Sequence, residues 1–433
     1  MQRAFALALS YVLAMPVVAG QLAATSASER TDGKISVIPT PMKAAMLPGI
    51  FTIRLNTVIL VDKSSPDALN VGQYLADLLS GATGYKIKVS DSGKARRVKG
   101  AILLSSRDAK PELGEEGYTL VVGPESVIIR APKPAGLFYG VQTLRQLLPP
   151  EIESRSPTSQ TIAWRAPCVQ IEDQPRFRWR GLLVDSARHF FPKESLKRFI
   201  ELMALHKFNV LQIHFTDDQS WTLEIGALPK LTKVGAFGGP YGIGSEWLGV
   251  GKGIGSGRYY SKDDVRELVR YAAQRHITIV PEIEMPAHAA SWLASYPELL
   301  CASHAKFPAP EIGKRGDATQ RIIWATYREL CPSNEATYEM AGKVLAGVAE
   351  LFPSGYLHIG GDEAAKLGWQ NCNRCQAKMK TEGLQDVKEL QSYFIKRTAR
   401  IVERQGRKLV GWDEIMEGGL APNAIVMSWR GVA

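Results

Sequence analysis

From residue 176 onward, apolar strand-like segments alternate with amphipathic helical segments. The strand-like segments cover residues 181–184, 210–215, 278–283, 356–359, 408–412 and 424–429. The segments between them carry apolar side chains at the i, i+3, i+4, i+7 spacing of a helix with one buried face, as in residues 196–203. Repeated strand–helix units specify a parallel sheet, so we predict a (β/α)8 TIM barrel over residues 176–433. An open doubly wound sheet is the alternative, and it would bind its ligand where the strand order reverses.

The polar residues that follow these strands distinguish the two folds. Charged side chains come directly after the first five predicted strands: Asp185 and Arg188, Asp217 and Asp218, Glu284 and His288, Asp362 and Glu363, Asp413 and Glu414. In a barrel the carboxyl ends of all strands meet on one face, where barrel enzymes keep their active sites. We therefore favour the barrel and expect the functional site at its mouth.

Residues 34–148 show a different pattern. Strand-like segments at 51–60, 101–105, 118–122 and 126–129 are mixed with helical segments, and residues 123–125 have the composition of a hairpin turn. This pattern predicts a small α+β domain. Residues 149–175 begin with two prolines and a polar stretch that has no periodicity, so we expect a linker there.

Asp362 and Glu363 are the strongest candidates for catalysis. Adjacent carboxylates are common on solvated surfaces and are weak evidence alone. Here they follow an apolar strand and two glycines, Gly360 and Gly361, which permit a tight turn. Their position above the predicted barrel mouth favours a functional role.

The string His-Ile-Gly-Gly-Asp-Glu at residues 358–363 resembles the H-x-G-G-D-E signature of glycoside hydrolase family 20. Further segments are similar to motifs of that family and follow the family's order: residues 188–190, 214–219, 281–288, 411–414 and 428–431. The resemblance covers about residues 34–433, because the smaller domain is also similar to the one that precedes the barrel in this family.

This resemblance implies an exo-acting, retaining β-N-acetylhexosaminidase whose substrates are oligosaccharides or glycoconjugates. In this family the nucleophile is the carbonyl oxygen of the substrate's own 2-acetamido group, and an oxazolinium intermediate forms. Glu363 would be the general acid and base, and Asp362 would accept the acetamido N–H. The implied chemistry uses no metal and no cofactor.

The resemblance also implies residues that bind the sugar. Arg188 would hold sugar hydroxyls with its fixed fork of donors, the alternative being an ion pair with Asp185 that braces the barrel rim. Trp412 and Trp429 would wall the acetamido methyl group, the alternative being packing in the core.

Asp217 and His288 resemble a supporting hydrogen-bonded network beside the catalytic acid. A buried histidine bonded to a carboxylate is also an ordinary structural feature. Two residues depart from the commoner form of the family, with Glu284 in place of Asp and Ala287 in place of Gly. We expect both departures to affect the geometry of the loop more than activity.

Two other functions are compatible with the same strand ends. A catalytically inactive sugar-binding relative would need no general acid, so the presence of both Asp362 and Glu363 argues against it. A metal-dependent barrel hydrolase would need clustered histidines. The histidines near the strand ends lie in different loops without an H-x-H pair: His189, His214, His288 and His358.

Six strands are predicted after residue 176, whereas a closed barrel has eight. We therefore expect the sequence to be a C-terminally incomplete fragment with little activity of its own. By resemblance, the missing units would supply residues that hold the acetamido carbonyl and the sugar hydroxyls. Exposed edges of the first and last strands would also favour aggregation.

Residues 1–20 have the pattern of a secretory signal peptide, with a positive start, an apolar stretch and small residues at a cleavage point. A membrane anchor is the alternative, but the apolar stretch is shorter than the ~20 residues that a spanning helix needs. No later segment is long and apolar enough to span a membrane. We expect a secreted or periplasmic protein.

The formal net charge of +10 raises nucleic acid as a partner. The basic residues are mostly scattered, and a run of them is usually a solvated surface. Only one predicted loop concentrates basic residues, and it contains Lys94, Arg96, Arg97 and Lys99. We predict no nucleic-acid binding.

The chain has five cysteines, so at least one stays unpaired if disulfides form. Cys372 and Cys375 form a C-x-x-C, for which we favour a structural turn or a local disulfide over half of a zinc site. The reason is that no second C-x-x-C and no nearby histidine pair is present. Cys301 and Cys331 flank a polar loop and are a second candidate pair. No metal site is predicted.

Overall fold

The computed structural model describes residues 35–62, 65–93, 98–154, 156–158, 162–237, 257–301 and 329–431. The predicted signal peptide at residues 1–20 lies outside them, as do Lys94, Arg96 and Arg97. Lys99 pairs with Glu125, with 3.1 Å between the ammonium nitrogen and a carboxylate oxygen. In the described parts of the chain, no helix is long and apolar enough to cross a membrane.

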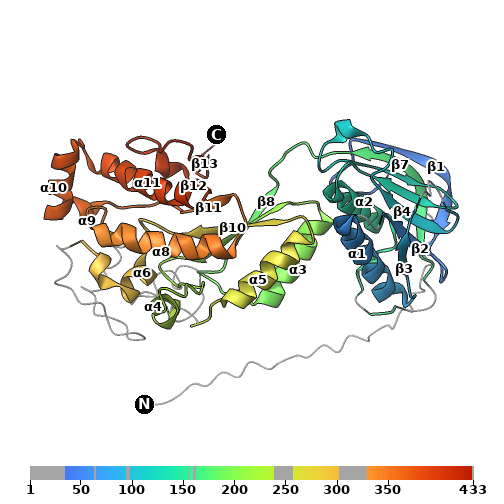
Figure 1. The fold of residues 1–433 in the computed structure, drawn as a ribbon, viewed down its shortest axis with the longest axis horizontal. Helices are drawn as coiled ribbons and strands as arrows, with labels where there is room; N and C mark the ends of the chain where they lie inside the picture. Colours follow the sequence, from blue (N-terminus) through green and yellow to red (C-terminus); the bar gives the residue numbers. More distant parts are fainter. Residues whose placement is uncertain are drawn as a thin grey trace, which may run out of the picture. The chain divides into compact units, whose positions relative to one another are not determined.

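The N-terminal domain is built on a seven-stranded sheet with the order β1-β7-β5-β6-β4-β2-β3 (Figure 1). Its strands are β1 (Lys43–Thr52), β2 (Val58–Val61), β3 (Lys88–Asp91), β4 (Ala101–Ser105), β5 (Tyr118–Val122), β6 (Val127–Arg130) and β7 (Arg165–Asp173). Helices α1 (Pro66–Thr83) and α2 (Pro134–Leu147) pack on this sheet, and η1 (Pro111–Leu113) and η2 (Pro150–Glu153) are short 3-10 turns. The small α+β domain is confirmed.

The predicted hairpin at residues 118–129 is also present. Strands β5 and β6 pair antiparallel, and the backbone N–H of Gly123 donates to the carbonyl of Ser126 at 2.9 Å. The turn residues therefore form the connection that their composition indicates.

The stretch expected to be a linker, residues 149–175, contains strand β7. This strand pairs with both β1 and β5, and it buries Ala166, Cys168 and Ile171. The two prolines and the polar stretch at the start of the segment led to the linker prediction, although the strand begins only at Arg165 and contains Pro167. This proline is tolerated because it faces only β1, since the pairing with β5 runs from Val169 to Asp173.

The C-terminal domain holds a six-stranded sheet with the order β13-β12-β11-β10-β9-β8. Its strands are β8 (Gly181–Asp185), β9 (Val210–Thr216), β10 (Thr278–Ile283), β11 (Tyr356–His358), β12 (Lys408–Trp412) and β13 (Ile425–Met427). All neighbouring strands are parallel and their spatial order follows the chain order. A doubly wound sheet would reverse that order, so the sheet is the wall of a TIM barrel. Within the described residues, β8 and β13 are its two edges.

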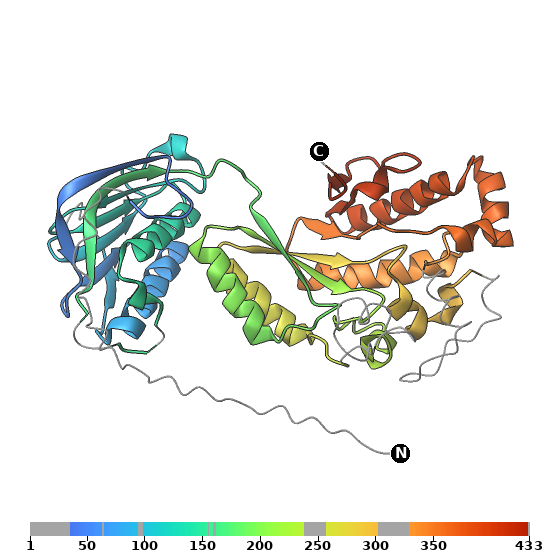
Figure 2. The same cartoon turned by 180° about the vertical axis from the view of Figure 1, so that it is seen from behind.

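Four crossover helices surround the curled sheet (Figures 1 and 2). They are α3 (Lys193–Leu205), α5 (Lys262–Ala273), α8 (Glu335–Leu351) and α11 (Val387–Arg404), and each contacts the next one along the chain. The predicted helix after residue 261 is α5, and Ser261 and Asp264 form a complete capping box at its start.

Shorter elements occupy the connections at the strand ends. They are α4 (Lys230–Lys233), η3 (Gly235–Phe237), α6 (Ala290–Ser295), η4 (Pro297–Leu299), α9 (Leu367–Gln370), α10 (Asn373–Glu382) and η6 (Asp413–Met416). Helices α9 and α10 follow the candidate catalytic pair in the chain, so they set the path of the backbone after Glu363.

The two faces of β9 differ in polarity. Every residue of this strand is buried. Phe215 packs against Phe352 and Tyr260 on the helix side. Gln212 and His214 point to the opposite face, where they meet carboxylates of β10 and of the loop that directly follows it. Alternation along the strand therefore lines the barrel interior with polar groups.

Candidate active site

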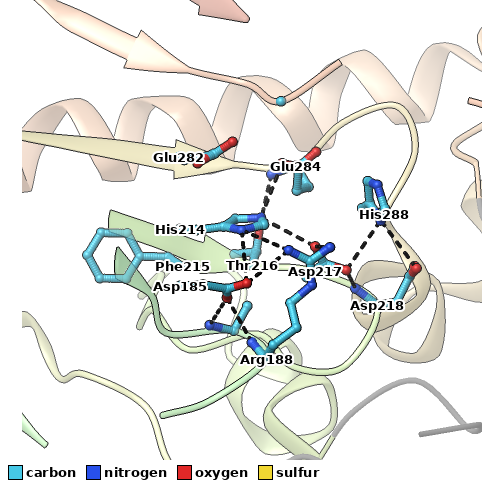
Figure 3. A network of polar contacts seen from close by, with 12 residues as sticks. Asp185, Arg188, His214, Phe215, Thr216, Asp217, Asp218, Glu282, Glu284 and His288 are labelled. Atoms are coloured by element: carbon cyan, nitrogen blue, oxygen red, sulfur yellow. Dashed lines mark hydrogen bonds and ion pairs between the residues drawn. The ribbon is translucent and has the colours of Figure 1, made fainter. Parts of the chain in front are cut away.

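Charged residues from the ends of β8, β9 and β10 meet in one network at the barrel mouth (Figure 3). Arg188 follows β8, Asp217 and Asp218 follow β9, and His288 follows β10. These residues are distant in the sequence, and the parallel strand ends bring them together. The predicted convergence of these side chains is confirmed.

Two carboxylates fix the position of Arg188. Its Nη1 lies 2.9 Å from Asp185 Oδ2, and its Nη2 lies 2.6 Å from Asp217 Oδ2. Burial would lower the pKa of the guanidinium, but Asp217 and Asp185 raise it, so the group stays charged. The side chain remains 32% exposed, which leaves donors available to a ligand. Arg188 therefore pairs with Asp185 and is also exposed at the barrel mouth.

His288 connects this network to the candidate catalytic pair. Its Nδ1 lies 3.3 Å from Asp217 Oδ1 and 3.4 Å from Asp218 Oδ2. Its Nε2 lies 3.4 Å from Asp362 Oδ2 and 3.3 Å from Glu363 Oε2. Burial alone would lower the pKa of the imidazole, but the charge of Asp217 and hydrogen bonds to the carboxylates raise it well above its ordinary value. A charged imidazolium therefore lies between two pairs of carboxylates.

Asp362 and Glu363 occupy different environments. The Asp362 side chain is 15% exposed, whereas that of Glu363 is 52% exposed. The backbone of Glu363 has a φ of 49°, in the left-handed region that non-glycine residues rarely adopt. Such strain is found mainly at functional sites, and two carboxylates in unlike surroundings are suited to different tasks.

The two glycines before this pair are required by sterics. A Cβ on Gly360 would lie 1.8 Å from Glu284 Oε2, and one on Gly361 would lie 2.5 Å from a methyl carbon of Ile415. Both glycines also have positive φ angles, 66° and 92°. The turn into Asp362 is therefore available only to glycine at these two positions.

Below the mouth lies a layer of buried ionisable groups, for none of which the sequence alone indicated a role in binding or catalysis. His214 Nε2 lies 3.1 Å from Glu284 Oε1, and His358 Nδ1 lies 3.1 Å from Glu282 Oε1. Burial raises the pKa of Glu284 well above its ordinary value. Burial would also raise the pKa of Glu282, but His358 and His214 lower it. Glu282 lies within β10, whereas Glu284 follows the strand beyond a register shift, so strand alternation alone does not predict that both carboxylates lie beside His214.

The two departures from the family pattern have local explanations. Glu284 is fully buried, and its carboxylate fills the space above Gly360 while reaching His214. Ala287 is buried in a cluster that also contains Ala364 of the catalytic loop. Both residues therefore shape the loops that carry His288 and Glu363.

The two predicted tryptophans lie at the ends of β12 and β13. Trp412 Nε1 donates to Glu282 Oε1 at 2.8 Å, and its ring packs edge-on against His358. Trp429 Nε1 donates to Glu414 Oε2 at 2.9 Å, and the residue is 50% exposed. Trp412 is thus tied to the buried layer, while half of the Trp429 surface is exposed to solvent.

Three groups of side chains in the described residues have the composition of a metal site. His214, Glu282 and Glu284 form one, and Asp217, Asp218 and His288 form another. In both groups the histidine already pairs with the carboxylates, and the Arg188 guanidinium on Asp217 would repel a cation. The third group consists of four buried cysteines.

The disulfides favoured from the sequence are not formed. All five cysteines are free thiols, including the C-x-x-C pair and the pair flanking the polar loop. The physical reason is that the fold brings the two candidate pairs into one cluster, so the sulfurs are shared among four side chains.

Two protein-family models match the chain. The model described as "Glycosyl hydrolase family 20, catalytic domain" matches residues 177–433, and "Glycosyl hydrolase family 20, domain 2" matches residues 34–174.

The chain belongs to glycoside hydrolase family 20.

Two relatives named β-hexosaminidase are similar over most of this chain. The β-hexosaminidase of Porphyromonas gingivalis is 38% identical over 401 residues, which are 92% of this chain and 48% of that protein. The β-hexosaminidase of Vibrio furnissii is 31% identical, with 91% of this chain and 60% of that protein covered. The chain therefore spans about half to three fifths of these two relatives.

Solved family 20 structures share the fold. The β-N-acetylhexosaminidase from Streptomyces coelicolor A3(2) superposes with a TM-score of 0.74 at 37% identity, covering 92% of this chain and 70% of that one. The exo β-N-acetylglucosaminidase from Vibrio harveyi, solved in complex with N-acetylglucosamine, gives a TM-score of 0.75 at 30% identity, covering 91% and 57%. These similarities confirm a TIM-barrel domain preceded by a smaller domain.

Proposed function

We propose that the protein carrying this chain is an exo-acting, retaining β-N-acetylhexosaminidase. Its substrates are terminal N-acetylglucosamine or N-acetylgalactosamine residues of glycans or chitin oligosaccharides. The observation that carries the proposal is the pair Asp362 and Glu363 at the barrel mouth, tied to Asp217 through His288. Family membership and the names of the relatives support it. An inactive sugar-binding relative is not favoured, because it would need neither carboxylate.

Glu363 acts first as general acid and then as general base. Its exposed carboxyl group protonates the glycosidic oxygen while the acetamido carbonyl oxygen of the substrate attacks the anomeric carbon. It then takes a proton from the water that opens the oxazolinium intermediate. Two inversions at the anomeric carbon retain its configuration. The His288 imidazolium, 3.3 Å from Glu363 Oε2, orients this carboxyl group.

Asp362 holds the attacking group. Its carboxylate is mostly buried, so it interacts strongly with charge that develops beside it. It accepts the acetamido N–H and offsets the positive charge of the oxazolinium. Arg188 binds sugar hydroxyls with its remaining donors, and Trp412 and Trp429 enclose the acetamido methyl group.

Replacement of Glu363 by glutamine tests the assignment. Glu363→Gln in the full-length protein should lower turnover of a substrate with a poor leaving group by the ~10² to 10⁴-fold typical of lost acid–base catalysis. The loss should be smaller with an aryl leaving group that departs without protonation. Glu350→Gln is the matched control, because Glu350 is similarly exposed at 58% but lies on α8. Near-normal turnover of the poor substrate by Glu363→Gln would remove Glu363 from this role.

We further propose that the protein is exported. The support is the pattern of residues 1–20, with a basic start, an apolar stretch and small residues before position 21. N-terminal sequencing of the protein recovered from the extracellular or periplasmic fraction should show that these residues have been removed. Recovery of an intact Met1 in the cytosol would contradict export.

A further inference from the structure

Four of the five cysteines meet in one buried cluster beside the catalytic loop. Cys301 follows η4, Cys331 precedes α8, Cys372 precedes α10, and Cys375 lies in the first turn of α10. Their exposed fractions are 2% for Cys301 and 0% for the other three. Two distant stretches of chain, one on each side of the catalytic pair, therefore contribute two sulfurs each.

The sulfur spacing fits a tetrahedral metal. Cys375 Sγ lies 3.7 Å from Cys301 Sγ and 3.7 Å from Cys331 Sγ, and all four sulfurs lie within 4.8 Å of one another. Four thiolates around a zinc ion, each with a Zn–S bond of about 2.3 Å, have their sulfurs about 3.8 Å apart. A disulfide requires about 2.0 Å, and it would pair Cys375 with one partner only. An equal distance to two partners is what a shared central ion requires.

We propose that Cys301, Cys331, Cys372 and Cys375 bind one zinc ion as a structural site with four thiolate ligands. This differs from the structural turn or local disulfide favoured from the sequence, and from the prediction that there is no metal site. A complete set of four protein ligands leaves no open position for water or substrate, so the ion would have no part in the chemistry.

The surroundings can stabilise the negative charge of four thiolates. Cys372 is the N-cap residue of α10, a ten-residue helix whose positive end faces the sulfurs. The hydroxyl of Ser333 lies 3.2 Å from Cys375 Sγ and 3.3 Å from Cys331 Sγ. A zinc ion displaces the thiol protons when it binds, so the four cysteines would coordinate it as thiolates.

The backbone positions of the ligands are fixed by hydrogen bonds. The N–H of Cys331 donates to Leu299 at 2.9 Å, and the N–H of Cys372 donates to Trp369 at 3.2 Å. Arg374 Nη2 donates to the carbonyl of Leu300 at 3.2 Å, which joins α10 to the segment that ends in Cys301. A preformed ligand set of this kind reduces the entropy lost on binding.

The cluster is continuous with the catalytic loop. Ala364, directly after Glu363, packs in the same hydrophobic cluster as the four cysteines. Trp369 is fully buried there, and its Nε1 donates to the carbonyl of Leu330, next to Cys331. The backbone N–H of Lys366 also donates to Glu329 Oε1 at 2.8 Å. The zinc ion would therefore anchor the segment that leaves the candidate catalytic pair.

Zinc content and thiol count together test the proposal. The full-length protein, purified without chelator from the compartment where it resides, should contain one zinc ion per chain by elemental analysis. After unfolding in chelator, all four cluster cysteines should react as free thiols, as identified by mass spectrometry of the labelled peptides. A zinc-free protein in which these four cysteines do not react would show two disulfides and overturn the proposal. A zinc-free protein in which all four react, or one that holds iron, would also overturn it.

Cysteine variants identify the ligands. Cys372→Ser and Cys375→Ser should lose the zinc ion and lower the thermal midpoint, whereas Cys168→Ser should keep one zinc ion per chain. Cys168 is a matched control, because it is fully buried but lies in β7, outside the cluster. Cobalt added to the metal-free wild type should give the visible absorption of a tetrahedral thiolate complex, a readout independent of activity. Equal zinc content in Cys168→Ser and Cys372→Ser, or no cobalt spectrum, would contradict the assignment.

Discussion

Alanine at Gly360 should damage the turn that carries the two candidate catalytic carboxylates. Gly360 has a φ of 66°, in the left-handed region. The new methyl carbon would lie 1.8 Å from Oε2 and 2.2 Å from Cδ of Glu284. Glu284 is only 1% exposed, so its carboxylate cannot move into solvent to make room.

Two costs add in this variant. An L-residue in the left-handed region costs roughly 1–2 kcal/mol. Forcing extra volume into a packed interior costs about 1–3 kcal/mol more. We therefore expect Gly360→Ala to lose about 2–5 kcal/mol of folding stability, a large part of the ~5–15 kcal/mol of a typical domain. A shift of the turn by ~1 Å should also lower turnover by up to ~10²-fold.

Two further glycines separate these costs. Gly383 has a φ of 69° but no atom within 4 Å of the added carbon. Gly383→Ala should therefore lose only the stability that corresponds to the strained backbone conformation. Gly342 lies within α8 without a positive φ and without a neighbour within 4 Å, so Gly342→Ala should be neutral or gain up to ~1 kcal/mol. Thermal midpoints should therefore fall in the order Gly342→Ala, Gly383→Ala, Gly360→Ala, at roughly 2–4 °C per kcal/mol.

Turnover of a chromogenic N-acetylglucosaminide, measured on the same three variants, separates stability from function. Gly342→Ala and Gly383→Ala should keep wild-type turnover below their melting temperatures. If Gly360→Ala were as stable and as active as Gly383→Ala, Glu284 would not be packed against this turn and the steric reasoning would be wrong.

The remaining predictions concern the charged network. Asp217→Asn should lose about 3–5 kcal/mol, because Asp217 is fully buried beside Arg188 and two histidines. Asp263→Asn, at an exposed pair, should lose no more than ~1 kcal/mol, and a similar loss in both variants would contradict the buried network. The folded-state pKa of His288 is raised, so its stabilising contribution is complete below about pH 6.5 and is lost as the pH rises through the raised value. The folded-state pKa of Asp185 is lowered, so its contribution is present above about pH 3.9 and is lost on acidification. The thermal midpoint should therefore decline on acidification, as Asp185 is protonated, and also at alkaline pH, as His288 loses its proton. A thermal midpoint that keeps increasing with pH beyond neutrality would contradict the charged state of His288.

The strand-end residues could be predicted because their signal is local. A parallel strand followed by charged residues places them at the barrel mouth, and this is enough to locate Arg188, Asp217, His288 and the Asp362–Glu363 pair. The contacts among them could not be predicted in the same way. The distance from His288 to both members of the catalytic pair depends on two loops whose backbones have unusual φ angles.

Three other features depended on long-range packing. Strand β7 pairs with β1 across more than a hundred residues, so the local sequence around Pro167 gave no sign of its partner. Glu282 was predicted to lie in a strand, but its contact with His358 depends on the pairing of β10 with β11. Cys375 and Cys301 are 74 residues apart in the sequence, and only the fold brings their sulfurs together.

Comparison of two substrates tests the proposed mechanism most directly. The full-length protein should be assayed with an aryl 2-acetamido-2-deoxy-β-glucoside and with the matching plain β-glucoside, alongside a thiazoline analogue of the oxazolinium intermediate. We predict hydrolysis of the acetamido substrate only, and tighter binding of the thiazoline than of the product, because the acetamido oxygen is the nucleophile and Asp362 holds it in place. Comparable kcat/KM for the plain β-glucoside, or a trapped ester between a sugar and a protein carboxylate, would contradict substrate-assisted catalysis.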